Sequence, residues 1–307
     1  MNEATRVAYG NALVELAERN PDVVVLDADL AGATKTAAFK GACPERFFDM
    51  GIAEADMVGT AAGLASCGKV PFATTFAVFA TGRAFDQVRN TVCYSNLNVK
   101  IVGTHAGPSC GEDGGTHQAM EDIALMRALP NMTVVVPADD VEARAATLAA
   151  AEHVGPMYLR MARLASPTVH DPESYHFELG KGEVLREGSD LSIIACGMMV
   201  PRALEAAKEL AGAGVEARVV NMHTIKPLDE ELVLDCARTT GAIVTVEEAS
   251  VIGGLGSAVA ELVSERCPVP VRRVGVQDRF GKSGNGSELL DELGLSVAHI
   301  VEVARSL

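Results

Sequence analysis

The sequence predicts an α/β fold of two three-layer α/β/α domains, each with a mainly parallel sheet between helices. Short apolar runs rich in β-branched residues, such as VVVLDADL at 23–30, are typical of strands buried in a parallel sheet. These runs alternate with longer stretches of helical periodicity, which indicates repeated strand–helix–strand units. The composition becomes polar over 164–189. We therefore expect a first domain at 1–165, a linker at 166–188 and a second domain at 189–307.

The first domain is expected to alternate strands with amphipathic helices. In its first helix, Val7, Leu13 and Leu16 belong to one apolar face, whereas its strands are continuous apolar runs. The predicted elements are helix 3–19, strand 23–30, a helix beginning near Glu54, strand 71–76, helix 79–94, strand 98–107, helix 118–128, strand 133–139, helix 139–152 capped by Ala138 or Asp139, and strand 156–162.

The second domain repeats this alternation. The predicted elements are strand 191–197, helix 200–214, strand 216–222, helix 229–241, strand 242–249, helix 254–267, strand 271–276, and one or two helices through 295–307. Within the linker, we expect an edge hairpin or a short strand around 177–186.

Charge and cysteine content exclude several classes of protein. A net charge of -15 argues against nonspecific nucleic-acid binding, which needs a cationic face. The seven cysteines are odd in number and include no CxxC pair, which argues against a disulfide framework or a zinc site. The sequence shows no apolar signal core and no apolar run of about 18 residues. We expect a cytoplasmic protein with no membrane segment and no metal ligands of its own.

Glu54 is the leading candidate for a catalytic residue. It lies at the start of a predicted helix, in the apolar company of Ala53, Met57 and Val58. Burial disfavours the charged form of a carboxylate, so such a group can exchange a proton with a ligand. The alternative is a first-turn glutamate that the helix dipole favours.

A polar loop follows the predicted strand 98–107. It contains His105, Glu112, Asp113 and His117, and ligands of parallel sheets bind at the carboxyl ends of strands. Asp113 and His117 could form a hydrogen-bonded pair that orients the hydroxyls of a polyol. The spacing matches no compact zinc pattern, and Ser109 lacks the elbow motif of serine hydrolases. A polar surface loop is the alternative.

Two further features have a structural and a functional interpretation. Phe76 and Phe79, spaced i and i+3 in TTFAVF, could pack in a core or stack on a heteroaromatic ring. The glycine turn SVIGGLGSA at 250–258 could cradle a phosphate at a helix start. It lacks a full dinucleotide or P-loop motif, so packing is the favoured interpretation.

Together these segments resemble the transketolase family over nearly the whole chain. GEDGGTHQ, followed by EDIALMRALPNMTVVVPAD, is similar to the substrate loop of that family and to the helix and strand after it. GIAE resembles its glutamate motif and TTFAVF its pyrimidine-stacking segment. The resemblance implies a domain that binds the pyrimidine of thiamine diphosphate, followed by a transketolase C-terminal domain.

The resemblance also implies roles for single residues. Glu54 would hydrogen-bond the pyrimidine nitrogen and favour the imino tautomer that accepts a proton from the thiazolium carbon. Phe79 would stack on the pyrimidine, with Phe76 beside it. His117, also with a catalytic role, and Asp113 would hold the hydroxyls of the sugars. Arg6, His105 and Arg163 would bind the sugar phosphate. Arg160, three residues before Arg163, is the alternative to Arg163 at this position.

Departures from the family pattern concern both ligands. Ala33 stands where the family commonly has a phosphate-binding serine, and only Thr34 beside it could substitute. Gly82 stands where many transketolases carry a tyrosine over the pyrimidine. No GDG followed by an Asn some 25–30 residues later is present, which is the family element that holds the diphosphate through magnesium. We therefore expect a separate N-terminal subunit to hold the diphosphate and Mg²⁺, in a tetramer of two copies of each chain.

The resemblance thus predicts one subunit of a split transketolase, which transfers a two-carbon ketol group between sugar phosphates in pentose phosphate metabolism. Other enzymes that share this layout are the β subunit of a 2-oxo acid dehydrogenase and 1-deoxy-D-xylulose-5-phosphate synthase. A non-catalytic regulatory or partner-binding subunit is the alternative of another class.

Overall fold

A seven-stranded sheet organises the first domain of the computed structural model, which describes residues 2–307. The strand order is β12-β6-β7-β5-β4-β2-β3, and every neighbouring pair is parallel except β12 with β6. The strands are β2 (Val23–Asp27), β3 (Phe47–Asp49), β4 (Val70–Phe76), β5 (Lys100–Thr104), β6 (Thr133–Val135), β7 (Met157–Arg160) and β12 (Thr224–Lys226). Strands β2, β4 and β5 are buried along their whole length, as the continuous apolar runs predict.

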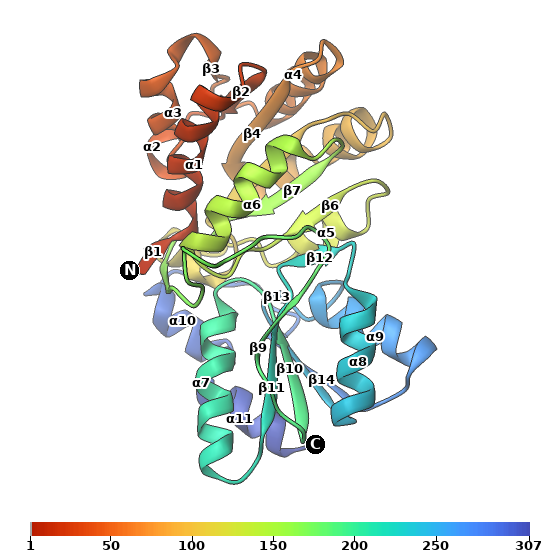
Figure 1. Ribbon diagram of the computed structural model, residues 1–307. Coiled ribbons are helices and arrows are strands. Elements are labelled where there is room, and N and C mark those ends of the chain that lie inside the picture. Colours follow the sequence, from red (N-terminus) through yellow and green to blue (C-terminus); the bar gives the residue numbers. More distant parts are fainter. Residues whose placement is uncertain (1) are drawn as a thin grey trace.

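Helices cover both faces of this sheet (Figure 1). They are α1 (Thr5–Arg19), α2 (Ala31–Thr34), α3 (Ala37–Ala42), η1 (Pro44–Arg46), α4 (Glu54–Ser66), η2 (Phe79–Arg83), η3 (Gln87–Cys93), η4 (Pro108–Asp113), α5 (Asp122–Arg127) and α6 (Asp140–Glu152). The N-cap of α6 is Asp139, whose carboxylate accepts a hydrogen bond from the Glu142 N–H. A short antiparallel pair, β1 (Asn2–Ala4) with β8 (Ala165–Pro167), ties the two ends of the domain together.

The second domain is a five-stranded sheet of order β14-β13-β10-β11-β9, parallel except for β9. Its elements are β9 (Glu183–Arg186), β10 (Leu191–Ala195), α7 (Met199–Gly212), β11 (Ala217–Asn221), α8 (Glu230–Thr240), β13 (Ile243–Ser250), α9 (Leu255–Arg266), β14 (Val271–Val276), α10 (Gly286–Glu292) and α11 (Val297–Arg305). The predicted fold class is confirmed, and the short strand expected in the linker is β9.

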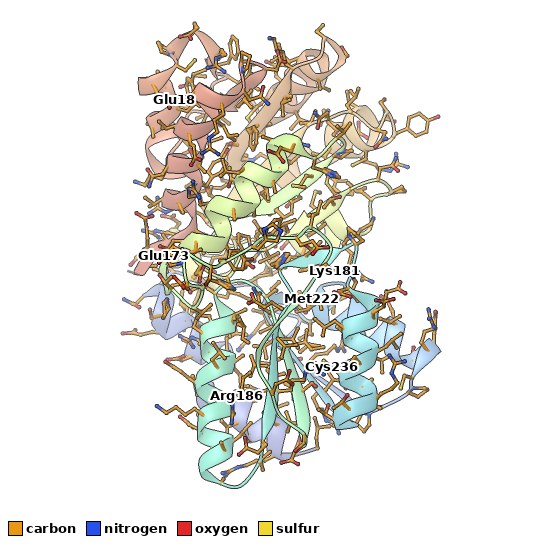
Figure 2. All side chains as sticks on the ribbon, viewed as in Figure 1. Glu18, Glu173, Lys181, Arg186, Met222 and Cys236 are labelled. Atoms are coloured by element: carbon orange, nitrogen blue, oxygen red, sulfur yellow. The ribbon has the colours of Figure 1, made fainter. Side chains whose placement is uncertain are left out.

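The two domains share a strand and a core. Strand β12 follows β11 in the second domain but pairs with β6 of the first sheet. One buried apolar cluster includes Leu26 and Ile101 of the first sheet together with Met222 and Cys236, which Figure 2 labels in the second domain. The change of composition at 164–189 does not indicate this interlocking.

Two predicted helices are wrong in detail. The segment 79–94 forms two π-helical pieces, η2 and η3, in place of one regular helix. The helix expected from Gln118 begins only at Asp122, because the Gln118 side chain ties its own segment to neighbouring loops by donating to the carbonyls of Gly111 and Lys282. Across the described residues, no helix is both long and apolar enough to cross a membrane.

Candidate active site

The predicted site residues gather at one edge of the first sheet. His105 follows β5, Phe76 ends β4 and is followed by Phe79, and Glu54 comes after β3. These strands lie next to one another or to β2, in the order β5-β4-β2-β3. Because carboxyl ends of neighbouring parallel strands meet at one edge, side chains distant in the sequence converge there.

Glu54 opens helix α4 and is buried, with 4% of its surface exposed. Its surroundings are not purely apolar, which corrects the expectation from sequence. The guanidinium of Arg83 donates to Oε1 of Glu54 at 3.0 Å. A cavity of about 250 Å³ is lined by both side chains together with Ile52, Phe79 and His117.

Aromatic rings form a stacked column next to Glu54. The His105 ring stacks on Phe76 with centroids 3.9 Å apart, and Phe76 stacks on Phe79 at 5.9 Å. The Arg83 guanidinium lies over the Phe79 ring, 3.9 Å from its centroid. His117 meets the Phe79 ring edge-on at 5.3 Å. Phe76 therefore contacts both His105 and Phe79 within the column, whereas Phe79 lines the cavity.

His105 lies among cations. Burial lowers its pKa to about 3, and the charges of Arg6, Arg163 and Lys35 lower it further in the same direction. The imidazole is thus neutral near pH 7, with Nδ1 2.9 Å from the Thr104 hydroxyl. A neutral imidazole flanked by fixed cations can donate a hydrogen bond to an anion without needing a proton from solvent.

The three cations differ in how fully their donors are used. Arg6 donates to the carbonyls of Ala33 and Arg163. Arg163 donates to the Cys110 carbonyl and pairs with Glu112 at 3.0 Å. Among residues 2–307, the side chain of Lys35 has no hydrogen bond or ion pair. The Lys35 ammonium is therefore the cation here with all its donors available.

Thr34 does not face these cations. Its hydroxyl donates to the buried carboxylate of Asp27 at 2.7 Å, and that of Thr36 donates to the same oxygen at 2.8 Å. The Thr34 hydroxyl is therefore used within the chain, and the structure does not support Thr34 as the replacement of a phosphate-binding serine. The two threonines instead hold the loop around Lys35, whose φ of 74° is left-handed. Asp29 and His105 also have positive φ, and such strain in non-glycine residues is concentrated at functional sites.

Asp113 and His117 lie in the same loop without forming the predicted pair. Asp113 accepts a bond from the Cys110 thiol and lies 3.7 Å from Arg163. His117 Nδ1 is 2.9 Å from the Thr116 hydroxyl. Both are at least partly exposed and remain available to a ligand.

Arg160 faces away from this site. It is 5% exposed and donates to Asp122 at 2.8 Å and to the Glu248 carbonyl at 2.8 Å. Of the two arginines, Arg163 is therefore the one whose charge acts on His105. Glu248 also accepts a hydrogen bond from the Ser109 N–H at 2.8 Å, so the second domain braces the substrate loop of the first. Gly107 allows this, because its φ is 71° and a Cβ would lie 2.5 Å from the Glu248 carboxylate.

The glycine turn at 250–258 is used internally. The N–H groups of Leu255 and Gly256, at the start of α9, donate to the buried Glu247 carboxylate at 2.8 Å. Burial raises the pKa of Glu247 to about 7. A carboxylate of the same chain thus takes the place that a phosphate would need, and the packing interpretation is the correct one.

Comparison with known proteins identifies the family. Residues 2–168 match the family described as transketolase, pyrimidine binding domain, and residues 180–300 match transketolase, C-terminal domain. The chain belongs to the transketolase family. The family predicted from GEDGGTHQ, GIAE and TTFAVF is confirmed.

Several transketolase relatives match along nearly the whole chain. It is 49% identical to a 6-deoxy-6-sulfo-D-fructose transketolase subunit of Clostridium sp., over 97% of this chain and 92% of that protein. It is 39% identical to one subunit of an apulose-4-phosphate transketolase of Phocaeicola vulgatus, over 98% and 96%. A solved structure described as a split gene transketolase, inactive beta4 tetramer, has a TM-score of 0.93 at 56% identity, over 99% of this chain and 97% of that chain. The chain is thus similar throughout to subunits of split transketolases.

Transketolases generally use thiamine diphosphate, and the cavity suits its pyrimidine end. A buried carboxylate and an aromatic ring line it, groups that fit a flat ring with hydrogen-bonding nitrogens, and the planar guanidinium of Arg83 contacts both of them. At Gly82, where many transketolases have a tyrosine, a Cβ would meet nothing within 4 Å. In the part of the chain described, no group of three or more His, Cys, Asp or Glu could hold a metal ion.

Sequence reasoning missed three residues of this site. Helical spacing alone gives no reason to pair Arg83 with Glu54. A lysine in a loop, such as Lys35, matches no motif, and Glu248 comes from the other domain. The TGR sequence after TTFAVF was the one local signal for Arg83, since it puts a cation one helical turn after Phe79.

Proposed function

We propose that this chain is the pyrimidine-binding subunit of a thiamine-diphosphate-dependent transketolase, active together with an N-terminal subunit. The observation that carries the proposal is the buried Glu54 carboxylate beside the stacking face of Phe79, at the sheet edge where His105 and His117 also lie. The bound cofactor would supply a nucleophilic carbon and the electron sink for cleaving a ketose.

Glu54 would hold a hydrogen bond to the pyrimidine nitrogen. Because Glu54 is buried, its carboxylate would hold the shared proton toward the ring and away from bulk solvent. Phe79 would stack on the ring, and Phe76 would keep Phe79 in place through the column. His117, at the cavity wall, and Asp113 would contact the sugar hydroxyls.

The cations around His105 would bind the anionic end of the sugar. Arg6, Lys35 and Arg163 supply the charge, and neutral His105 supplies a hydrogen-bond donor. Relatives are named for a sulfo-sugar and for apulose 4-phosphate, and both names denote sugars with an anionic group. We propose ketose and aldose phosphates of pentose phosphate metabolism as substrates. Without a hydroxyl at position 33, Lys35 would take over part of the binding of the phosphate.

The partner would hold the diphosphate and Mg²⁺, and we propose two copies of each chain. The similar solved structure described as an inactive beta4 tetramer supports the need for such a partner. The exposed Ile52, 75% accessible at the cavity wall, would be covered by the partner or the cofactor.

The test is a reconstitution. The chain is mixed with its N-terminal subunit, thiamine diphosphate and Mg²⁺, and then with xylulose 5-phosphate and ribose 5-phosphate. We expect a seven-carbon ketose phosphate. Turnover of pyruvate with a lipoyl acceptor would favour a 2-oxo acid dehydrogenase, and pyruvate with glyceraldehyde 3-phosphate a deoxyxylulose phosphate synthase. Tight assembly without any turnover would favour a regulatory subunit.

Glu54→Gln tests the proton role. The amide keeps the shape of the side chain but cannot share the proton, so we expect turnover to fall at least about a thousandfold, within the range for lost acid–base groups. The fold should persist by circular dichroism. Asp56→Asn, at an exposed position on the same helix, is the matched control. Near-normal turnover of Glu54→Gln would refute the role.

A further inference from the structure

Arg83 makes two contacts inside the pyrimidine cavity. Its Nη1 donates to Glu54 Oε1 at 3.0 Å, and its guanidinium carbon lies 3.9 Å from the centroid of the Phe79 ring. These are the same two interactions that the proposed function assigns to the cofactor ring, a hydrogen bond to Glu54 and stacking on Phe79. The guanidinium can make both because it is planar, cationic and rich in N–H donors.

Ring and guanidinium cannot use these partners at once. The cavity of about 250 Å³ is lined by Glu54, Phe79, Arg83 and His117, and the Arg83 head group forms part of its wall, directly against Glu54 and Phe79. Phe76 packs beside Phe79, with nearly parallel rings whose centroids lie 5.9 Å apart. A ring that stacks on the Phe79 face covered by Arg83 must displace the guanidinium.

Arg83 is well placed both to hold this position and to leave it. The Glu54 side chain is 5% exposed, and removing one partner of a buried ion pair is destabilising. The Arg83 side chain is 53% exposed and ends the π-helical piece η2. Its long stem can thus turn into solvent without disturbing the buried side of the helix.

We propose that Arg83 is a positioning residue that occupies the place of the pyrimidine in the chain without cofactor, neutralises Glu54, and is displaced when thiamine diphosphate binds. The free chain thereby keeps its buried glutamate paired, and cofactor affinity is reduced by the competition. This inference rests on the proposed function.

The test measures binding, independently of turnover. Calorimetry gives the Kd of thiamine diphosphate for the assembled two-chain enzyme with wild-type chain, Arg83→Ala, and Arg89→Ala as an exposed control on η3. We expect Arg83→Ala to lower Kd by about tenfold, the order expected for one exposed ion pair plus one cation–π contact. Arg89→Ala should leave Kd unchanged. An unchanged or higher Kd for Arg83→Ala would overturn the inference, because Arg83 would then be neutral or a cofactor ligand.

A second measurement separates the inference from the proposed function. In the full chain without cofactor, Arg83→Ala should lower the thermal midpoint, and this loss should disappear in the Glu54→Gln background. An equal decrease of the thermal midpoint in both backgrounds would show that Arg83 does not stabilise the chain through its ion pair with Glu54. If the variants of the chain without cofactor show this coupling but the wild-type two-chain complex binds no thiamine diphosphate, the proposed function fails and the competition with it, while the pairing of Glu54 stands.

Discussion

Lys35 has an environment unusual for a lysine of an acidic protein. It lies near Arg6 and Arg163, has a left-handed backbone, and is without an ion pair among the described residues. Gly10 of α1 allows this, because a Cβ at Gly10 would lie 2.7 Å from the Cβ and carbonyl oxygen of Lys35. A strained backbone that places an unpaired cation among others is favourable only if an anion uses it.

Lys35→Gln tests this use. Removing one charge-assisted hydrogen bond should raise KM for xylulose 5-phosphate by about tenfold with little change in kcat. Hydroxypyruvate, a donor without phosphate, should keep its KM. Lys40→Gln, five residues later and exposed, is the control in the same steady-state assay. A KM increase shared by both donors would contradict phosphate binding by Lys35.

At this scale, residues within local motifs could be predicted from sequence. Glu54, Phe79 and His117 line one cavity, and Arg6, His105 and Arg163 lie together, as their motifs implied. What sequence could not provide is which side chains turn toward one another. Thr34 turns to Asp27 because a buried carboxylate needs hydrogen-bond donors, and Asp113 lies near Arg163 because its carboxylate is attracted by that cation.

The elements that carry the site are held by contacts from the other domain. Glu248, on β13, accepts the Ser109 N–H of the substrate loop and lies beside Arg160 of β7. The Gln118 amide bridges the same loop to the carbonyl of Lys282. These contacts replace the first turn of the helix expected at 118–128, a tertiary effect that helical periodicity cannot reveal.

Glu248→Ala tests the brace. It leaves the Ser109 N–H unsatisfied and removes a buried negative charge near Arg160, so we expect the free energy of unfolding to fall by about 3 kcal/mol. Urea unfolding of the full chain measures this. Glu265→Ala, an exposed position on α9, should change stability little. Equal effects of the two substitutions would show that Glu248 does not brace the loop.

The boundary between the domains contains coupled titratable groups. Burial lowers the pKa of His223 to about 4, aided by the charge of His170. Burial raises the pKa of Glu142, 4.0 Å from His223, to about 7. A histidine whose folded-state pKa is depressed stabilises the fold above about pH 6.5, and this contribution is lost as pH falls toward 4.

His223→Asn isolates that contribution. Between pH 7 and pH 5 we expect wild type to lose about 2 kcal/mol more unfolding free energy than His223→Asn, given the depressed pKa. Urea unfolding at both pH values measures the difference. His176→Asn, exposed in the linker, should follow wild type. Parallel losses in wild type and His223→Asn would contradict the depressed pKa.

The strand β12 has a consequence for how this protein can be divided or fused. A fragment ending near residue 168 would contain the first sheet without β12, leaving β6 with open N–H and C=O groups that can pair with another copy. A nick in the linker would leave both pieces joined by the same strand pair. The smallest part that can be transplanted into another polypeptide, or joined to a diphosphate-binding domain, is therefore the pair of domains together.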